Sequence, residues 1–293
     1  MIDQRRRIAA WPRCAFLVLL LSCGVLGALP ASAHDVWLAP RGPVAPDQPV
    51  RLELRIGHLS DEQPNASEVM LRDGRRIDSL RVHAPDGRSL EPPGLDGSAL
   101  VGAFRPTVSG TWIVAFVGRP FFNHLDTEEF SAYLDEEGMQ TIAAEHARRG
   151  LTEGREWVSR SVKTLVQVGD PSMPPSDRAI GLPVELVLRS LDDSTLELEV
   201  QIEGRPAPGQ TIELRHLNGR QPGLIARADA NGRAHFSVVP GPFLATALHM
   251  RPARPDDSAH AVDGTPADWR SIFAASTFVV PTLSPPGATE IRP

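Results

Sequence analysis

The sequence predicts a mainly β protein with two immunoglobulin-like or prealbumin-like β-sandwich domains and an inserted helical hairpin. Three observations support this fold class. Short apolar runs with a period of two recur along most of the chain, separated by turn signals. The period changes to that of a helix within residues 126–150. Residues 169–176 (GDPSMPPS) have the composition of a linker and divide the chain into two parts of domain size.

Residues 1–33 have the three parts of a secretory signal peptide. A cationic front at residues 5–7 precedes an uncharged apolar run, and the segment ends in an A-x-A cleavage site. The apolar run is shorter than the roughly 20 residues of a spanning helix, which favours removal over anchoring. We therefore expect cleavage between Ala33 and His34 and a periplasmic or secreted protein.

Two other export signals match the same segment less well. Residues 20–23 (LLSC) form a poor lipoprotein box, because Leu21 is bulky where a small residue is usual. Arg5 and Arg6 could mark twin-arginine export, although the residues around them match that signal only loosely. Either alternative would also place the protein outside the cytoplasm.

The composition of the mature chain excludes several classes of function. Cleavage after Ala33 leaves 260 residues with 26 Lys and Arg against 35 Asp and Glu, a net charge of −9. This charge disfavours binding to nucleic acid or to anionic lipid. Cys14 and Cys23 both lie in the signal, so the mature chain has no disulfide, thiolate metal site or cysteine nucleophile. No later segment approaches membrane-spanning length, so we expect no transmembrane segment in the mature chain.

The first domain is expected at residues 34–169. Residues 50–56 (VRLELRI) alternate apolar and charged side chains, which predicts a half-buried strand. Residues 85–88 (PDGR) form a turn signal, and residues 111–117 (TWIVAFV) read as a strand. A further strand is expected from about residue 157 to residue 168.

A helical hairpin is predicted at about residues 126–150. Asp126 followed by Glu129 resembles a capping box, and apolar residues then follow at helical spacing. Gly138 ends this helix. A second helix is expected at about residues 140–149, with Gly150 beyond its end.

The second domain is expected at residues 177–281 as another all-β unit. Its runs at residues 184–188, 196–202, 212–214 and 236–238 keep a period of two. Glycine-containing turns separate these runs, and a last strand is expected at residues 274–280. About seven short strands are typical of an immunoglobulin-like sandwich. Residues 282–293 read as a loose tail.

Four blocks resemble a known family. They are residues 34–40 (HDVWLAP), 55–58 (RIGH), 130–138 (FSAYLDEEG) and 155–163 (REWVSRSVK). Together they resemble the NikM-like group of periplasmic proteins with an uncharacterised domain, which is associated with nickel or cobalt uptake. The resemblance covers nearly all of the mature chain. Two residues depart from the family pattern. Val36 stands where an aromatic residue is usual, and Trp157 stands where tyrosine is usual, but neither is a candidate ligand.

His34 and His58 are the main candidate metal ligands. As the mature amino terminus, His34 would offer its imidazole and its free α-amine to one metal ion, and a histidine from another strand would complete the set. His58 follows Gly57 at the end of a predicted strand. This ligand type suits Cu(II) and, with more ligands, Ni(II) or Co(II). The alternative is a plain surface terminus that begins with histidine.

Asp35 and His249 are weaker candidates. Asp35 could bind the metal or orient His34, although a strand-start role is the simpler interpretation. His249 ends a predicted strand of the second domain, and its neighbour Met250 should point to the opposite face. We interpret Glu156, Arg160 and Lys163 as an ion-pair cluster that packs the hairpin against the sheet.

The function expected from these residues is binding of a divalent transition metal, nickel or cobalt first and copper next, as an accessory to a membrane metal-uptake system. A non-metal binding or scaffold module that uses the hairpin as its interaction surface is an alternative. A further alternative is a copper oxidoreductase that binds its metal in a histidine brace. The sequence holds no G-x-S-x-G, H-E-x-x-H or phosphate-binding loop, so we do not expect an enzyme.

Overall fold

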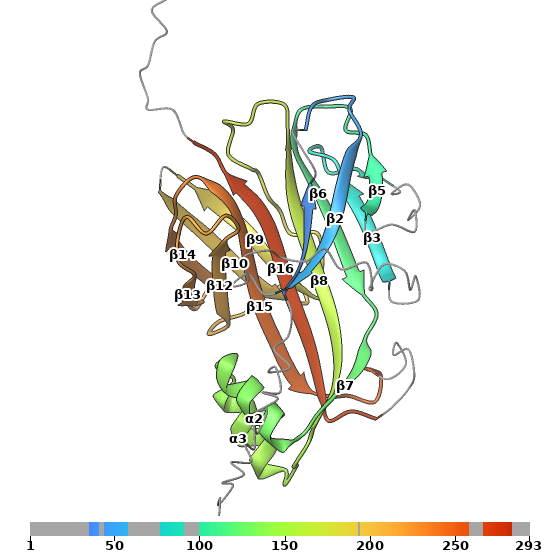
Figure 1. Ribbon diagram of the computed structural model, residues 1–293, viewed down its shortest axis with the longest axis vertical. Coiled ribbons are helices and arrows are strands. Elements are labelled where there is room, and N and C mark those ends of the chain that lie inside the picture. The colour runs from blue at the N-terminus through green and yellow to red at the C-terminus, as the bar shows by residue number, and fades with distance from the viewer. Residues whose placement is uncertain are drawn as a thin grey trace, which may run out of the picture.

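A computed structural model describes residues 35–40, 44–57, 77–90, 100–192, 194–257 and 266–282 of the chain. The described residues form sixteen strands, arranged in three sheets, and two helices (Figure 1). The predicted fold class, mainly β with a helical hairpin, is confirmed. No described helix is long and apolar enough to cross a membrane.

The largest sheet has nine strands and runs through the length of the molecule. Its order is β13-β12-β15-β16-β8-β6-β3-β4, and β7 pairs with β8 beyond the end of β6. In that order the strands are Leu224–Arg227, Thr211–His216, Gly241–Pro252, Trp269–Val280, Gly154–Val168, Gly110–Gly118, Ile77–His83 and Ser89–Leu90, with β7 at Phe121–Leu125.

Two smaller sheets complete the two sandwiches. One is β1-β2-β5, at Asp35–Pro40, Val50–Gly57 and Leu100–Phe104. The other is β11-β10-β14 with β9 also paired to β10, at Arg205–Pro206, Thr195–Ile202, Arg233–Ser237 and Val184–Leu191.

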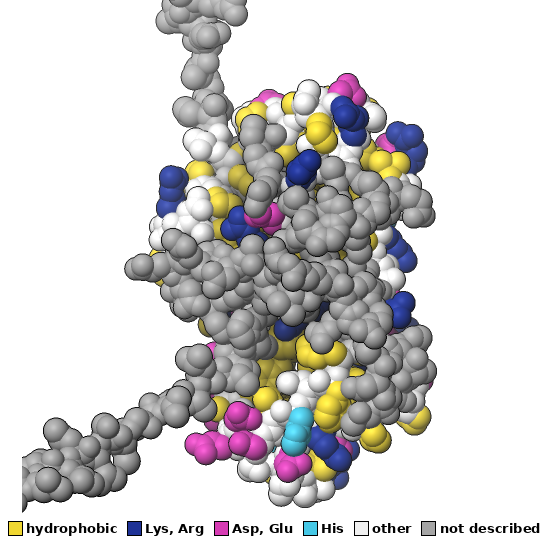
Figure 2. Space-filling view, turned by 45° about the vertical axis from the view of Figure 1, so that its right-hand side comes forward, with side chains coloured by type: hydrophobic (Ala, Val, Ile, Leu, Met, Phe, Trp, Pro, Cys, Tyr) yellow, Lys and Arg dark blue, Asp and Glu magenta, His cyan; other side chains and the backbone are white. Residues whose placement is uncertain are grey.

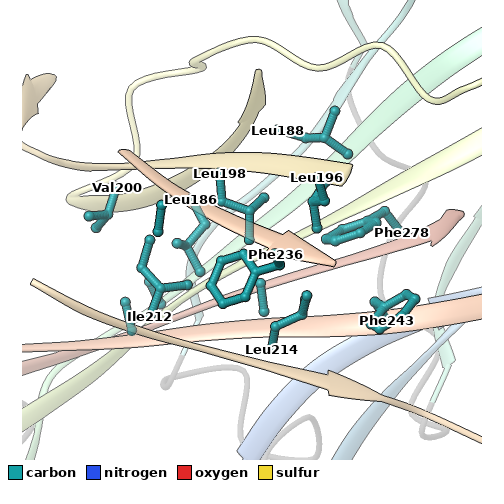
Figure 3. Close-up of a cluster of buried hydrophobic side chains, with 14 of the residues drawn as sticks. Leu186, Leu188, Leu196, Leu198, Val200, Ile212, Leu214, Phe236, Phe243 and Phe278 are labelled. Carbon is teal, nitrogen blue, oxygen red and sulfur yellow. The ribbon is translucent and has the colours of Figure 1, made fainter. Parts of the chain in front are cut away.

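The two small sheets cover opposite faces of the large one. Leu165 and Ala274 pack into the core under β9-β10-β14. Val166 and Ala275, one position further along the same strands, pack into the core under β1-β2-β5. Successive side chains of a strand point to opposite faces, so one sheet serves both cores. Figure 3 shows the first of these cores, with Phe236 near its centre.

β8 and β16 join the two halves of the large sheet. They pair in parallel from Trp269 opposite Glu156 to Thr277 opposite Thr164. β16 is the last described strand, and β8 ends the predicted first domain. Their pairing continues the hydrogen-bonded sheet from one sandwich into the other. β15, β16 and β8 form the long central strands of Figure 1.

The predicted hairpin is present as α2 (Thr127–Glu136) and α3 (Gln140–Arg148). Asp126 and Glu129 form the capping box that the sequence indicates. Phe130 packs with Met250 and Trp269 in a third apolar cluster. The hairpin therefore lies against β15 and β16 at one end of the molecule (Figure 1).

Candidate functional site

The two main candidate ligands, His34 and His58, lie outside the described residues. Their neighbours in the sequence are described. Asp35 is the first residue of β1 and Gly57 the last residue of β2, and the two are partners in the antiparallel register. Partner residues of an antiparallel pair have Cα atoms about 4.5 to 5.5 Å apart.

Asp35, the weaker carboxylate candidate, is held by an arginine from the other sandwich. Arg215 of β12 donates from Nη1 to Asp35 Oδ2 at 3.0 Å, and its Nε contacts Glu213 Oε1 at 2.7 Å. The structure therefore supports an ion-pair role for Asp35 and fixes the start of β1 against β12.

A cavity of about 570 Å³ opens beside Asp35. Its walls come from the start of β1, the end of α2, β8, β12, β15 and β16. The carboxylates that line it are Asp35, Glu136, Glu137 and Glu213, and the cations are Arg160 and Arg215. Figure 2 shows acidic side chains gathered beside hydrophobic ones at the hairpin end of the molecule.

Glu137, at the end of α2, has the most perturbed carboxylate of this cavity. Burial raises its pKa to about 7, and the negative charges of Asp35, Glu136 and Glu213 add to the shift. Arg160 acts in the opposite direction. The other three carboxylates of the cavity therefore act on Glu137, which changes its charge near neutral pH.

Arg160 extends from β8 toward the same cavity and is only 9% exposed. Its guanidinium lies over the ring of Phe273, 4.1 Å from the ring centre. It forms no ion pair or hydrogen bond with any residue that the structure describes, and its Nε is buried. Burial lowers the pKa of Arg160. This cavity was not predicted from the sequence, because its walls come from six separate segments of the chain.

The prediction that Glu156, Arg160 and Lys163 form one ion-pair cluster is wrong. Glu156 and Arg160 are an even number of positions apart and share the hairpin face of β8, whereas Lys163 points to the other face. There Lys163 Nζ contacts Asp177 at 3.0 Å and Glu185 at 3.1 Å. The sequence already indicated this, because Arg160 and Lys163 are an odd number of positions apart and such residues of a strand point to opposite faces.

His249 lies on the opposite face of the large sheet from Asp35. Its strand neighbours Leu248 and Met250 belong to the hairpin cluster, whereas Ala247 belongs to the core under β9-β10-β14. Burial, with Arg251 and other arginines nearby, lowers the pKa of His249. The structure does not bring His249 together with Asp35, and Met250 points away from it as expected.

The other described histidines have structural partners. His146 Nδ1 accepts a hydrogen bond from Trp269 Nε1 at 3.2 Å and packs against Phe130. His124 contacts Glu153 at 3.2 Å. Within the described part of the chain, no three His, Cys, Asp or Glu side chains form a group that could hold a metal ion.

Phe130 bears on the scaffold alternative. That alternative uses the hairpin as its interaction surface, but Phe130 of α2 is only 1% exposed. Phe122 packs edge-on against the buried Trp157, with ring centres 5.5 Å apart. The hairpin therefore turns its main aromatic side chain toward the sheet.

Comparisons with known proteins give a family and no activity. A family model described as a domain of unknown function, DUF4198, matches residues 31–251. No curated protein matches the chain.

Solved structures with distant similarity include a tetra-tandem repeat from the extending region of a large adhesion protein, at 13% identity and a TM-score of 0.21. The match covers 85% of this chain and 50% of that one, so this chain spans half its length. A segment of two fibronectin type-III domains from chicken tenascin matches at 11% identity and a TM-score of 0.19, covering 73% of this chain and 90% of that one. The D0-D1 domain of intimin matches at 11% identity and a TM-score of 0.18, covering 84% and 98%.

Proposed function

The chain belongs to the DUF4198 family, whose description assigns no activity, and we propose from its own residues that it is an exported protein that binds a divalent transition metal at His34. One observation carries the proposal. Asp35 and Gly57 are cross-strand partners, and they are the sequence neighbours of His34 and His58. If the antiparallel ladder continued by one residue, the two histidines would face each other.

The chemistry of the terminus favours a transition metal. Cleavage after Ala33 frees the α-amine of His34, so one residue supplies two nitrogen ligands, and His58 supplies a third. Nitrogen ligands of this kind suit nickel, cobalt and copper. Asp35, which Arg215 holds at 3.0 Å, would orient the terminus and leave direct binding to the histidines.

The charge around the terminus supports attraction of a cation. Asp35, Glu136, Glu137 and Glu213 line one cavity beside the start of β1. A cleft lined mainly by one sign of charge raises the local concentration of the opposite ion. In the periplasm this would favour capture of a dilute metal and its delivery to a membrane uptake system, the role that the resemblance in residues 34–40 and 130–138 implies.

The experiment compares metal affinity in proteins with different amino termini. Nickel, cobalt and copper are titrated into the mature protein and into a variant with one extra alanine before His34. The extra residue removes the free amine from His34, and we expect affinity to fall by about tenfold or more, since a lost ligand removes at least about 1.4 kcal/mol. His58→Ala should weaken binding by a similar factor.

His249→Ala is the matched control, because His249 lies on the other face of the large sheet and should leave affinity unchanged. Equal affinity in the mature and extended proteins would refute chelation by the terminus. Mass spectrometry of the exported protein checks that processing ends at Ala33.

A further inference from the structure

Arg160 forms no ion pair or hydrogen bond with any residue that the structure describes, although the negative charges of Glu156, Asp35 and Glu137 act on it from a distance. It is buried at the edge of the cavity, and among the described residues its only close partner is the ring of Phe273 at 4.1 Å. A buried charge that lacks a partner is unfavourable relative to the same charge in water. Such a group calls for an explanation, and a ligand that completes it is one.

The rest of the cavity carries the opposite charge. Arg215 is already engaged by Asp35 and Glu213, at 3.0 and 2.7 Å. Glu136 and Glu137 remain at the hairpin side of the cavity, and neither forms an ion pair with another described residue. A free anion at Arg160 would therefore meet nearby carboxylates, whereas a free cation at the carboxylates would meet Arg160.

The cavity also has apolar wall. Met139, Leu248 and Phe273 contribute to its lining. Its volume of about 570 Å³ lies within the range of about 300 to 1,000 Å³ of sites for small organic molecules. A ligand with an anionic group, a cationic group and a short apolar part would contact all three kinds of surface.

We propose that this cavity binds a small zwitterion, such as an apolar α-amino acid, with its carboxylate on Arg160 and its ammonium group on Glu136 and Glu137. The guanidinium binds the carboxylate through two parallel N–H donors, and Phe273 holds the guanidinium plane in place. The apolar side chain of the ligand lies against Met139 and Leu248. The metal proposal also draws on the carboxylates of this cavity, but Arg160, Glu136 and Glu137 are not among its metal ligands, so the two proposals are tested separately.

The first test uses L-leucine and two compounds that each lack one charged group. Protein treated with EDTA is titrated calorimetrically with L-leucine, with 3-methylbutylamine, which lacks the carboxylate, and with 4-methylpentanoate, which lacks the amine. We expect L-leucine to bind at least about tenfold more tightly than either fragment, because each fragment lacks the charge-assisted hydrogen bonds of one charged group. If either fragment bound as tightly as L-leucine, or if L-leucine did not bind, the proposal would be wrong.

The second test places the ligand at Arg160. Arg160→Met keeps a long apolar side chain over Phe273 and removes the charge, and we expect it to weaken L-leucine binding by about tenfold or more. Arg148→Met is the matched control, since Arg148 is exposed on α3 and pairs with Glu145. Unchanged affinity in Arg160→Met would overturn the assignment.

The melting temperature shows whether Arg160→Met is still folded, so that weaker binding is not mistaken for misfolding. Removing an unpaired buried charge should leave the melting temperature of Arg160→Met equal to or above that of the unmodified protein without ligand. L-leucine should raise the melting temperature of the unmodified protein and not that of the variant. Metal binding at His34 is measured separately, so failure of one proposal leaves the other standing.

Discussion

Lys163 is the only lysine of the chain, and it is 1% exposed. Its ammonium group lies between Asp177 and Glu185, at 3.0 and 3.1 Å. Five backbone N–H groups also donate to these two carboxylates, from Arg178, Leu188 and residues 180–182. The network links β8 to β9 and to the segment before it, and each of its charged groups has a partner.

Lys163→Met should destabilise the protein by about 3 to 5 kcal/mol, because it leaves two buried carboxylates without their cation. Urea unfolding at neutral pH measures the change. In Lys163→Met with Glu185→Gln, part of the loss should be recovered, since one of the uncompensated charges is gone. A loss below about 1 kcal/mol for the single variant would show that the network contributes little.

Glu137 makes the stability of the protein depend on pH. Its pKa is about 7 in the folded protein against 4.5 as a free side chain, because of burial and the charges of Asp35, Glu136 and Glu213. The folded state therefore holds the proton more tightly, and this stabilising contribution is full below about pH 4.5 and is lost as the pH rises through 7.

Comparison with Glu137→Gln between pH 5 and pH 8 isolates this contribution. Because Glu137 is partly exposed, we expect the unmodified protein to lose about 1 to 2 kcal/mol more than the variant over that range. Denaturant unfolding at several pH values gives the difference. Parallel curves for the two proteins would exclude a raised pKa at Glu137.

At the scale of elements, the helical hairpin was the part of the chain most readily predicted. Its signals are local: the capping box at Asp126 and Glu129, and Gly138 and Gly150 in left-handed backbone with φ of 65° and 67°. The side chains that dock it could not be predicted in the same way. Trp269 lies more than one hundred residues from Phe130, and no local pattern joins them.

Docking of the hairpin depends on Gly154, at the start of β8. A Cβ atom at this position would lie 2.2 Å from Cδ2 of Phe130. Gly154→Ala should therefore displace Phe130 and destabilise the protein by about 1 to 3 kcal/mol.

A double-mutant cycle with Phe130→Ala tests the cause of that loss. In the Phe130→Ala background, which removes the ring that clashes, Gly154→Ala should cost at least about 1 kcal/mol less. If the effects of the two substitutions on stability were additive, Gly154→Ala would destabilise the protein for a reason other than the clash with Phe130.

At the scale of the whole molecule, two sandwiches share one nine-stranded sheet. Ile113 and Leu165 lie in the core of the second sandwich, while Leu244 and Ala275 lie in the core of the first. Alternating runs predicted strands and sandwiches because periodicity is a local property. The parallel pairing of β8 with β16 depends on residues far apart in the sequence, so it was not predicted.

The shared sheet predicts that both sandwiches unfold together. Calorimetry of the mature protein should show one transition whose calorimetric and van't Hoff enthalpies agree. Residues 34–169 expressed alone should not fold, because they lack β16 and the side chains of Leu244 and Ala275. Two separate transitions, or a folded fragment, would contradict this coupling.

The approach of His34 to His58 stays a prediction, because both lie outside the described residues. Their sequence neighbours Asp35 and Gly57 are paired at the ends of β1 and β2. His249, by contrast, lies on the far face of the sheet, because strand parity decides the face and the sequence gives no register between distant strands. The cavity around Arg160 arises only when β1, β8, β12 and the hairpin meet.

The position of a bound metal tests the central proposal most directly. Mature protein that begins at His34 is crystallised with nickel, and anomalous scattering at the nickel absorption edge locates the ion. We predict one strong peak at the paired ends of β1 and β2, within about 2.0 to 2.2 Å of the α-amine and imidazole of His34 and of the imidazole of His58. A peak at another place, or none at that end of the two strands, would contradict the proposal.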